Sequence, residues 1–340
     1  MAAGRNRKPP RPLIAMAEFD LIRRLRDIIC IPDGDDAAKC VVGIGDDGAV
    51  LDIPGGQQLV VCTDTVVGGV HFPDDTAATA IGHKALAVNL SDLAAMGADP
   101  AWFLMALTLP ADNDDWLAAY ADGMGSLAKN TGIMLAGGDV SSGPLSICIT
   151  ALGLVDKGEA LTRAGACKGD LVVVSGAPGS AANALKMRAE GQVPDRNDLA
   201  ALEFPVPRLA LGRKLRTIAT ACIDISDGLL ADLGHILEQS AVGAELALEN
   251  LPCPASLVNV PGDERWPLQL AGGDDYELCF TIPPASARQL EDISLACAVE
   301  LTVIGSITDC DLVLKTADGA HYEPGLAGYQ HFYQAGAENG

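Results

Sequence analysis

The sequence predicts an α/β fold made of two domains, and three observations support this prediction. The chain has 340 residues, which is more than one ordinary hydrophobic core organises. Hydrophobic residues make up 49% of the chain and charged residues 20%, so it holds enough apolar material for two cores. Apolar runs of strand length alternate with helical patterns, which is typical of α/β layers. A turn-rich stretch near 155–158 divides the chain into domains at 16–155 and 156–335, preceded by an arm at 1–15 that we expect to be disordered.

The first domain is expected to alternate helices and strands. In chain order, its expected elements are a helix at 18–29, strands at 49–51 and 59–62, a helix at 77–96, a strand at 101–109, a helix at 116–131, and strands at 133–136 and 145–154. Apolar residues at helical spacing predict the first helix. The turn Pro54-Gly55-Gly56 joins the first two strands, and residues 63–65 close the second of them. Gly97 ends the alanine-rich helix that precedes it.

The helix at 77–96 has one polar stripe in an otherwise apolar sequence. Lys84 and Asp92 fall within roughly 80° on its helical wheel, and Asn89 lies within roughly 60° of Asp92. Two interpretations of this stripe stay open. It is either a solvated face or, because small alanines surround it, a closely packed face with a function.

The second domain is also expected to alternate strands and helices. Its expected elements are a strand at 171–175, an alanine-rich helix opened by the turn 176–180, a polar connection with prolines at 193–207, a strand at 218–225, a helix at 229–238, a strand at 278–282, a helix at 285–296, and strands up to a tail at 328–332. The turn at 176–180 runs from strand to helix as a phosphate-binding loop does. It lacks the Lys-Ser/Thr ending of a Walker loop, so an ordinary tight turn is the favoured interpretation.

Six short motifs place an aspartate beside a glycine or a hydroxyl residue at the expected ends of elements. They are Gly43-Ile44-Gly45-Asp46-Asp47, Cys62-Thr63-Asp64-Thr65, Ser91-Asp92, Gly137-Gly138-Asp139, Asp224-Ile225-Ser226-Asp227-Gly228 and Gly272-Gly273-Asp274-Asp275. Adjacent aspartates repel each other unless a positive charge lies between them. A set of hard oxygen ligands of this kind suits Mg²⁺ and phosphate.

Composition excludes several classes of function. The net charge of −22 opposes binding to nucleic acid, which needs a basic face. No stretch approaches the ~20 apolar residues of a membrane span, and the N-terminal arm lacks the apolar core of a signal peptide, so we expect no membrane partner. None of the ten cysteines forms a Cys-x-x-Cys pair, which favours reduced thiols and a cytoplasmic location.

Among the chemistries that use carboxylates, metal-assisted phosphoryl transfer fits best. The Asp-x-Asp-x-Asp-Gly pattern of an EF-hand is missing, and aromatic residues, at 4%, are too few for a sugar-stacking glycosidase site. The five histidines are too scattered for a zinc site, and no Gly-x-Ser-x-Gly elbow occurs. An ordinary acidic surface would not place its aspartates beside glycines at strand ends. In phosphoryl transfer the protein mainly positions the reactants and neutralises charge, which such a carboxylate set can do with Mg²⁺.

These motifs resemble those of thiamine-monophosphate kinases, whose superfamily includes aminoimidazole ribonucleotide synthetase and selenophosphate synthetase. The matching stretches are Gly43-Ile44-Gly45-Asp46-Asp47, Thr63-Asp64, His71-Phe72, 84–98, Gly137-Gly138-Asp139, Leu161-Thr162-Arg163, 224–229 and 272–278. The match runs from about residue 18 to the tail. Its most specific parts are the helical stretch and Gly-Gly-x-Asp-Tyr-Glu-Leu.

The resemblance implies that ATP phosphorylates thiamine monophosphate to thiamine diphosphate with several Mg²⁺ ions. Carried over by position, the implied Mg²⁺ ligands are Asp47, Cys62, Thr63, Asp64, Asp92, Asp139, Asp224 and Asp227. The implied ATP contacts are Gly138, Asp139, Arg163 and Ser226. The implied contacts to thiamine monophosphate are His71, Asp274 and Leu326. The resemblance requires no general base, because the acceptor is already a phosphate oxyanion.

The sequence departs from the family pattern at three of these positions. Asp274 stands where the family usually has a glutamate, which is one methylene longer. Cys62 replaces a serine, so that a metal contact there would use its backbone carbonyl. Leu326 stands where an aromatic residue is common. The departures affect the acceptor end of the implied site more than the ATP end.

The resemblance also implies a particular architecture. An N-terminal mixed sheet with helices would pair with its copy across a homodimer, and a C-terminal α/β domain would follow. Two alternatives stay open for the function. One is another ATP-dependent enzyme of the superfamily, such as an amidine cyclase acting on a ribonucleotide. The other is a non-catalytic protein of the same fold, which the retained aspartates argue against.

Overall fold

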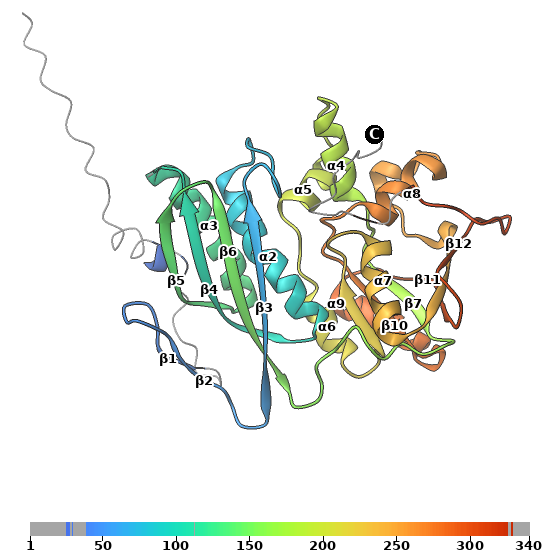
Figure 1. Cartoon of the computed structure of the whole chain (residues 1–340), viewed down its shortest axis with the longest axis horizontal. Coiled ribbons are helices and arrows are strands. Elements are labelled where there is room, and N and C mark those ends of the chain that lie inside the picture. Colours follow the sequence, from blue (N-terminus) through green and yellow to red (C-terminus); the bar gives the residue numbers. More distant parts are fainter. Residues whose placement is uncertain (1–24, 28, 30–38, 112, 326–327, 329–340) are drawn as a thin grey trace, which may run out of the picture.

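The computed structural model describes residues 25–27, 29, 39–111, 113–325 and 328 (Figure 1). Within the helix expected at 18–29, the described residues 25–27 and 29 are helical. The expected arm at 1–15, the rest of that helix and the tail beyond Gly328 lie outside the described residues.

A four-stranded mixed sheet forms the N-terminal half of the chain (Figure 1). Its strands lie in the order β3 (Gln57–Val67), β6 (Ser146–Asp156), β4 (Asp99–Leu109) and β5 (Met134–Ser142). β4 and β5 are parallel, and the other two pairs are antiparallel. Helices α2 (Ala78–Ala95) and α3 (Asp114–Thr131) lie over one face of this sheet, which we call the inner face. The opposite, outer face has no helix over it within the described part of the chain.

The two helices begin, end and pack as their sequences favour. The Asn113 side chain caps α3 by accepting a backbone hydrogen bond from its first turn. The expected stop of the preceding helix is confirmed, because α2 ends just before Gly97, whose φ is 66°. Gly82 of α2 and Gly123 of α3 allow backbone-to-backbone packing. A Cβ on either glycine would lie 2.0 Å or less from a carbonyl oxygen of the other helix.

Two strands run further than the sequence predicts. β3 continues through 63–65 to Val67, because its β-branched residues pair with β6 along the whole strand. β5 continues through Gly137-Gly138-Asp139 beside β4. A Cβ on Gly138 would lie 2.0 Å from the carbonyl oxygen of Met105, so the glycine permits this close pairing. Both aspartate motifs therefore lie inside strands, and the expectation that they follow strand ends is wrong.

A separate hairpin precedes the sheet. β1 (Lys39–Val42) and β2 (Val50–Asp52) are antiparallel, so β2 pairs with β1 and not with the strand that follows the turn at 54–56. Leu51 of the hairpin packs against Trp102 and Leu154 on the outer face of the four-stranded sheet. Burial of these apolar side chains explains why the hairpin turns away from β3.

The C-terminal half contains a six-stranded sheet. Its strands lie in the order β12 (Val313–Lys315), β9 (Gly243–Ala247), β11 (Leu301–Thr308), β7 (Leu171–Ser175), β10 (Leu278–Ile282) and β8 (Ala221–Asp224). Only the pair β12–β9 is parallel. The bounds of β7 and β10 are those expected from the sequence, whereas β8 is shorter and β9 was not predicted.

Six α-helices and three 3₁₀ turns accompany the second sheet in the described residues. The helices are α4 (Ser180–Ala189), α5 (Arg196–Glu203), α6 (Leu209–Leu215), α7 (Leu229–Ser240), α8 (Gly262–Ala271) and α9 (Leu290–Cys297). The 3₁₀ turns are η1 (Leu248–Asn250), η2 (Ala255–Leu257) and η3 (Pro284–Gln289). The expected connection at 193–207 contains α5, which Asp195 caps. The helix expected at 285–296 divides into η3 and α9, and α6 and α8 were not predicted.

Helix α2 connects the two halves of the molecule (Figure 1). Leu86 and Leu90 of α2 belong to the same hydrophobic core as Phe280 of β10. Near the end of α2, Arg216 donates hydrogen bonds to the carbonyl oxygen of Gly97 and, at 2.8 Å, to Asp99 Oδ2. The two sheets are thus packed against one shared helix.

None of the described helices combines the length and the apolar character that crossing a bilayer would need.

Candidate active site

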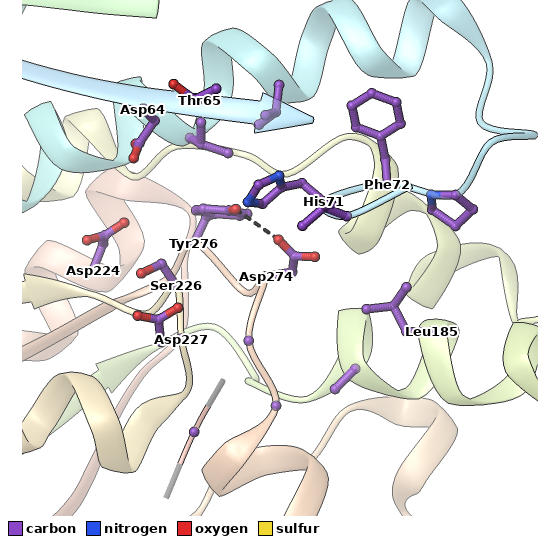
Figure 2. A pocket seen from close by; sticks show the side chains of 18 of the residues that line it. Asp64, Thr65, His71, Phe72, Leu185, Asp224, Ser226, Asp227, Asp274 and Tyr276 are labelled. Atoms are coloured by element: carbon purple, nitrogen blue, oxygen red, sulfur yellow. Dashed lines mark hydrogen bonds between the residues drawn. The ribbon is translucent and has the colours of Figure 1, made fainter. Parts of the chain in front are cut away.

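A cleft of about 920 Å³ lies between the two halves of the molecule (Figure 2). The N-terminal half contributes the end of β3, the loop at 68–73 and part of α2. The C-terminal half contributes α4, the segment at 224–227 and the loop at 271–276. The cleft therefore brings together seven residues that the sequence comparison proposed for the site. They are Asp64, His71, Asp92, Asp224, Ser226, Asp227 and Asp274.

The polar residues of α2 contact cleft segments from both halves of the molecule. The Asn89 side chain accepts a hydrogen bond from the backbone N–H of Asp64 at 3.1 Å. The Ser91 hydroxyl donates to Asp224 Oδ2 at 2.7 Å. Lys84, Asn89 and Ser91 are all buried. Of the two interpretations of the polar stripe, the solvated face is wrong and the packed face is confirmed.

The aspartates at this end of the cleft repel one another. Burial, followed by the charges of Asp224 and Asp64, raises the pKa of Asp92 to about 8. Burial also raises the pKa of Asp224 to about 6, with a further rise from Asp64, while the hydrogen bond from Ser91 opposes the shift. Burial raises the pKa of Asp64 as well. Charge of this sign and density favours a bound cation.

The donor chemistry of this carboxylate group fits Mg²⁺, although the ligands are not yet gathered. Asp64, Asp92, Asp224 and Asp227 present only hard oxygen atoms to the cleft. No three His, Cys, Asp or Glu side chains among the described residues already lie close enough to hold a metal ion. A cation would therefore have to draw these carboxylates together or share its coordination with a phosphate.

A buried carboxylate holds the loop that follows β8. Asp232 Oδ2 accepts hydrogen bonds from the backbone N–H groups of Ser226, Asp227 and Gly228, at 2.9, 3.1 and 3.2 Å. Burial, followed by the charge of Asp224, raises the pKa of Asp232 to about 7. Sequence reasoning did not single out Asp232. The sequence signal that could have identified Asp232 is its position five residues after Asp227, on the first turn of α7.

The opposite end of the cleft contains His71 and Asp274 (Figure 2). His71 Nδ1 accepts a hydrogen bond from the backbone N–H of Val67 at 2.9 Å, so the neutral ring carries its proton on Nε2. Asp274 Oδ1 accepts from the Tyr276 hydroxyl at 2.8 Å. Asp274 Oδ2 lies 2.9 Å from Lys84 Nζ. Neither Lys84 nor Tyr276 was assigned a role from the sequence, although both stand in the matching motifs.

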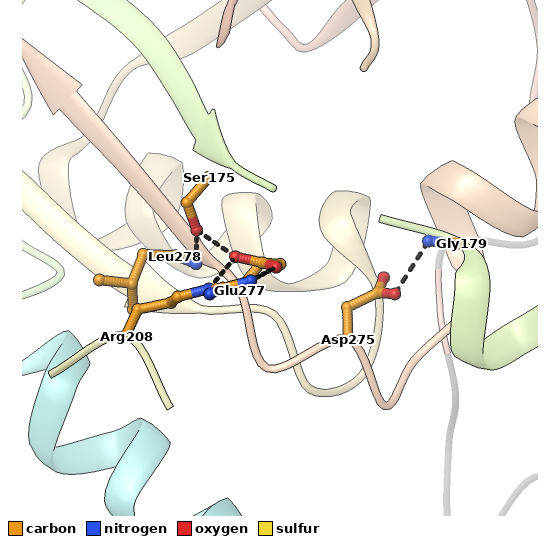
Figure 3. A network of polar contacts seen from close by, with 6 residues as sticks. All are labelled: Ser175, Gly179, Arg208, Asp275, Glu277 and Leu278. Carbon is orange, nitrogen blue, oxygen red and sulfur yellow. Dashed lines mark hydrogen bonds and ion pairs between the residues drawn. The ribbon is translucent and has the colours of Figure 1, made fainter. Parts of the chain in front are cut away.

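Two acidic side chains of the loop at 272–277 bind neighbouring segments of the C-terminal half and hold the loop in place (Figure 3). Glu277 accepts hydrogen bonds from the Arg208 guanidinium and, at 2.5 Å, from the Ser175 hydroxyl. Asp275 Oδ1 accepts from the backbone N–H of Gly179 at 2.8 Å. A carboxylate thus already lies at the turn 176–180 that opens α4, which disfavours phosphate there and supports the interpretation of an ordinary turn.

Several sequence-predicted site residues lie outside the cleft. Thr63 points to the outer face of the sheet, where its hydroxyl lies 3.1 Å from that of Thr150. Asp139 lies on the same face, on β5, three strand spacings or about 14 Å from β3. Gly138 precedes it in the same strand, and Asp47 is exposed in the loop between β1 and β2.

The remaining predicted residues lie near the cleft or beyond the described residues. The Cys62 thiol donates to the carbonyl oxygen of Asn89 at 3.4 Å, and burial raises its pKa. Arg163 is exposed and does not line the cleft, although its charge opposes the rise that burial causes in the pKa of Asp224. Leu326 lies outside the described residues.

Comparison with known proteins agrees with this arrangement. Residues 45–155 match the model of the AIR synthase related protein N-terminal domain, and residues 168–315 match that of the C-terminal domain. The chain is 42% identical to the thiamine-monophosphate kinase of Escherichia coli strain K12 over 329 residues, which cover 94% of this chain and 99% of the relative. The chain belongs to the thiamine-monophosphate kinase family.

Solved structures of this family share the fold. A thiamine-monophosphate kinase from Stenotrophomonas maltophilia K279a has a TM-score of 0.81 and 44% identity, covering 88% of this chain and 96% of that one. AaThiL complexed with AMPPCP and TMP has a TM-score of 0.72 and 28% identity, covering 93% and 97%. The two-domain α/β fold expected from the sequence is thus confirmed.

Proposed function

We propose that this chain transfers the γ-phosphoryl group of ATP to thiamine monophosphate, giving thiamine diphosphate and ADP. The observation that supports this most strongly is the similarity to thiamine-monophosphate kinases over nearly the whole chain. AaThiL, which has the same fold, has been seen with AMPPCP and TMP, an ATP analogue and an acceptor. A substrate such as ATP also favours a cytoplasmic location for the reaction.

The carboxylate end of the cleft suits a reaction between two anions. Mg²⁺ ions, when bound, would supply the positive charge that the phosphates of donor and acceptor need. We propose that Asp64, Asp92, Asp224 and Asp227 hold these ions, with the Cys62 carbonyl beside them. Ser226 and Arg163 would contact ATP, and Arg163 offers a fork of N–H donors that matches phosphate oxygens.

The other end of the cleft suits the acceptor. His71 Nε2–H is a donor for the phosphate of thiamine monophosphate, because Nδ1 is already occupied by Val67. Asp274 provides negative charge for the cationic ring system. Phe72 and Leu185 provide apolar walls around it (Figure 2). Leu326 would close this end, as the aromatic residue does in the family pattern. The acceptor oxygen is already ionised, so no general base is needed.

We further propose that two chains pair through the outer face of the N-terminal sheet. Leu59, Val61 and Leu104 lie on this face and are 37%, 55% and 38% exposed, which is unusual for a sheet face of a lone chain. Thr63 and Asp139, two of the implied metal ligands outside the cleft, lie on this face. Pairing would give Asp47, Thr63, Gly138 and Asp139 a partner surface against which to complete their part of the ATP site.

An ATP-dependent amidine cyclase and a non-catalytic protein are less well supported. The match to thiamine-monophosphate kinases extends through both domains, and Asp64, Asp92, Asp224 and Asp227 are present at the cleft. These observations favour a kinase over either alternative.

A product assay tests the proposed function. The purified chain, ATP and Mg²⁺ are incubated with thiamine monophosphate or with thiamine, and the products are separated by chromatography. We expect thiamine diphosphate from the monophosphate and no phosphorylation of thiamine, because the proposed site binds the acceptor through its phosphate. Comparable rates with thiamine, or no product from the monophosphate, would overturn the proposal.

A further inference from the structure

Lys84 is a buried charge for which the proposed reaction gives no role. Its side chain is only 4% exposed and stands in the middle of α2. Its Nζ lies 2.9 Å from Asp274 Oδ2 and donates to the carbonyl oxygen of His71 at 3.3 Å. Burying an ammonium group is unfavourable unless it is paired and hydrogen-bonded, so these two contacts compensate for the burial of Lys84.

These two contacts join the segments that form the acceptor end of the cleft. The ring of His71 is fixed at Nδ1 by Val67, and the backbone of His71 is fixed by Lys84. The Asp274 carboxylate is held at one oxygen by Tyr276 and at the other by Lys84. One side chain therefore sets the position of both groups that face the acceptor.

The loop that carries Asp274 needs such support. Asp274 and Tyr276 have φ values of 69° and 51°, in the left-handed region that side-chain-bearing residues adopt only when the surroundings hold them there. Backbone hydrogen bonds from Asp274 to Ser226 and from Tyr276 to Ile225 fix one side of the loop. The ion pair with Lys84 fixes the other side through the carboxylate.

Lys84 does not line the cleft itself. Its effect on a ligand must therefore pass through Asp274 and the carbonyl group of His71. The carboxylates that face ATP and metal in our proposal are held by other partners, among them Asn89 and Ser91. Loss of Lys84 should leave these contacts in place.

We propose that Lys84 is a positioning residue for the acceptor subsite: through Asp274 and the carbonyl oxygen of His71 it sets the affinity for a cationic, phosphate-bearing acceptor. This inference rests on the proposed function. The polar stripe of α2 then contributes to both ends of the cleft. Lys84 positions the acceptor end, and Asn89, Ser91 and Asp92 belong to the metal and nucleotide end.

A double-mutant cycle tests the proposal. Steady-state kinetics are measured for the wild type, Lys84→Met, Asp274→Asn and the double variant, with Lys129→Met on the exposed side of α3 as the control. Because a hydrogen-bonded ion pair is lost, we expect Lys84→Met to raise KM for thiamine monophosphate about tenfold, with KM for ATP changed less than about twofold. The double variant should lose less than the sum of the two single effects, since both changes act on the Asp274 carboxylate. The control should match the wild type.

Calorimetric titration with thiamine monophosphate in the absence of ATP gives an independent readout of the same subsite. Weaker acceptor binding by Lys84→Met supports the proposal. An unchanged KM for the acceptor, an equal rise in both KM values, or additive effects in the double variant would contradict it. If wild-type protein makes no product, the proposed function fails and not merely the role of Lys84.

If Lys84→Met does not fold, Tyr276→Phe provides a second variant that tests the same subsite. It removes only the hydroxyl that holds the other oxygen of Asp274. The proposal predicts the same selective rise in KM for thiamine monophosphate, of smaller size. A rise in KM for ATP alone would place Asp274 at the nucleotide end and refute the inference.

Discussion

At the scale of single residues, two of the carboxylates that face the cleft are held by side chains from another element. Ser91 holds Asp224 and Lys84 holds Asp274, while the backbone of Asp64 is held by Asn89. These contacts hold the segments that carry the carboxylates before any ligand arrives, so that a cation has only to draw the side chains together. Pre-organisation of this kind reduces the ordering that substrate binding would otherwise require.

Asp232 should matter for turnover although it does not line the cleft. Asp232→Ala removes the acceptor of three backbone hydrogen bonds in the loop that carries Ser226 and Asp227. We expect a loss of stability of about 1–3 kcal/mol, since buried donors are left unpaired, and a larger relative loss of kcat/KM. Urea unfolding and steady-state kinetics check this. Asp263→Ala on the exposed first turn of α8 is the control, and equal effects of the two variants would contradict the role of Asp232.

The buried aspartates also predict a pH dependence of stability. Asp92 and Asp232 have folded pKa values raised to about 8 and about 7, mainly by burial. Unfolded carboxyl groups titrate near pH 4, so between about pH 4 and pH 8 the folded chain binds more protons than the unfolded chain. The free energy of unfolding of the metal-free chain should therefore fall as pH rises through this window.

The melting temperature in EDTA from pH 5 to pH 8 measures this slope. Asp92→Asn should flatten it, because the variant no longer titrates at this position. Added Mg²⁺ should stabilise the wild type more at pH 8 than at pH 5, where protons compete for the carboxylates. A slope that is identical in Asp92→Asn would count against the assignment.

At the scale of elements, local patterns predicted most of the framework. Helix α2 was expected at 77–96 and spans Ala78–Ala95, because an alanine- and leucine-rich run ends at a glycine. Strands β7 and β10 were predicted with their observed bounds, because both are short apolar runs buried on each face. The short helix α5 escaped prediction, because only Leu202 and Asp198 of its eight residues are buried.

The cleft contains only some of the residues that the sequence predicts for the site. Thr63 and Asp64 are neighbours in sequence, yet they point to opposite faces of β3 because side chains alternate along a strand. Asp139 was grouped with the cleft aspartates by its glycine-rich motif, whereas the strand order places it on the far edge of the sheet. The motif alone does not indicate which face of the sheet a side chain occupies, or whether its strand lies at the edge of the sheet. Both follow from register and strand order, which depend on the whole fold.

The close contact between α2 and α3 predicts opposite effects for two glycine-to-alanine changes, one at this contact and one in a helix with open space around its glycine. Gly82→Ala should destabilise the chain by about 1–3 kcal/mol or more, because the new methyl group would meet the carbonyl oxygen of Tyr120 and force the helices apart. Gly234→Ala, in α7, meets no atom within 4 Å and should stabilise the chain by up to about 1 kcal/mol. Chemical denaturation of both variants checks the opposite signs, and destabilisation by both would show that the packing argument is wrong.

At the scale of the whole molecule, the cleft depends on how the two halves are joined. Arg216 of the second half binds Asp99 and Gly97 of the first. Arg188 on α4 pairs with Asp75 and, at 3.0 Å, with Glu203. These contacts flank the shared helix α2. They keep His71 and Asp274, which come from different halves, on either side of one cleft.

The proposed pairing of two chains predicts an effect of charge on the outer face of the sheet. Val61→Glu combined with Leu104→Glu should convert a dimer to a monomer, because two chains would bury like charges against each other. Val193→Glu changes a residue that is 87% exposed but lies outside the sheet, and it should leave the assembly unchanged. Sedimentation velocity distinguishes these states. A wild-type chain that sediments as a monomer would contradict the pairing.

The most direct test of the central claim is the turnover of thiamine monophosphate by Asp64→Asn and Asp92→Asn. Both residues belong to the carboxylate end of the cleft, whereas Asp122 on α3 is exposed and serves as the matched control. If this cleft gathers the cations for phosphoryl transfer, each cleft variant should lose about a hundredfold or more in kcat while keeping a cooperative melting transition, and Asp122→Asn should match the wild type. Near-wild-type rates in both cleft variants would contradict the account.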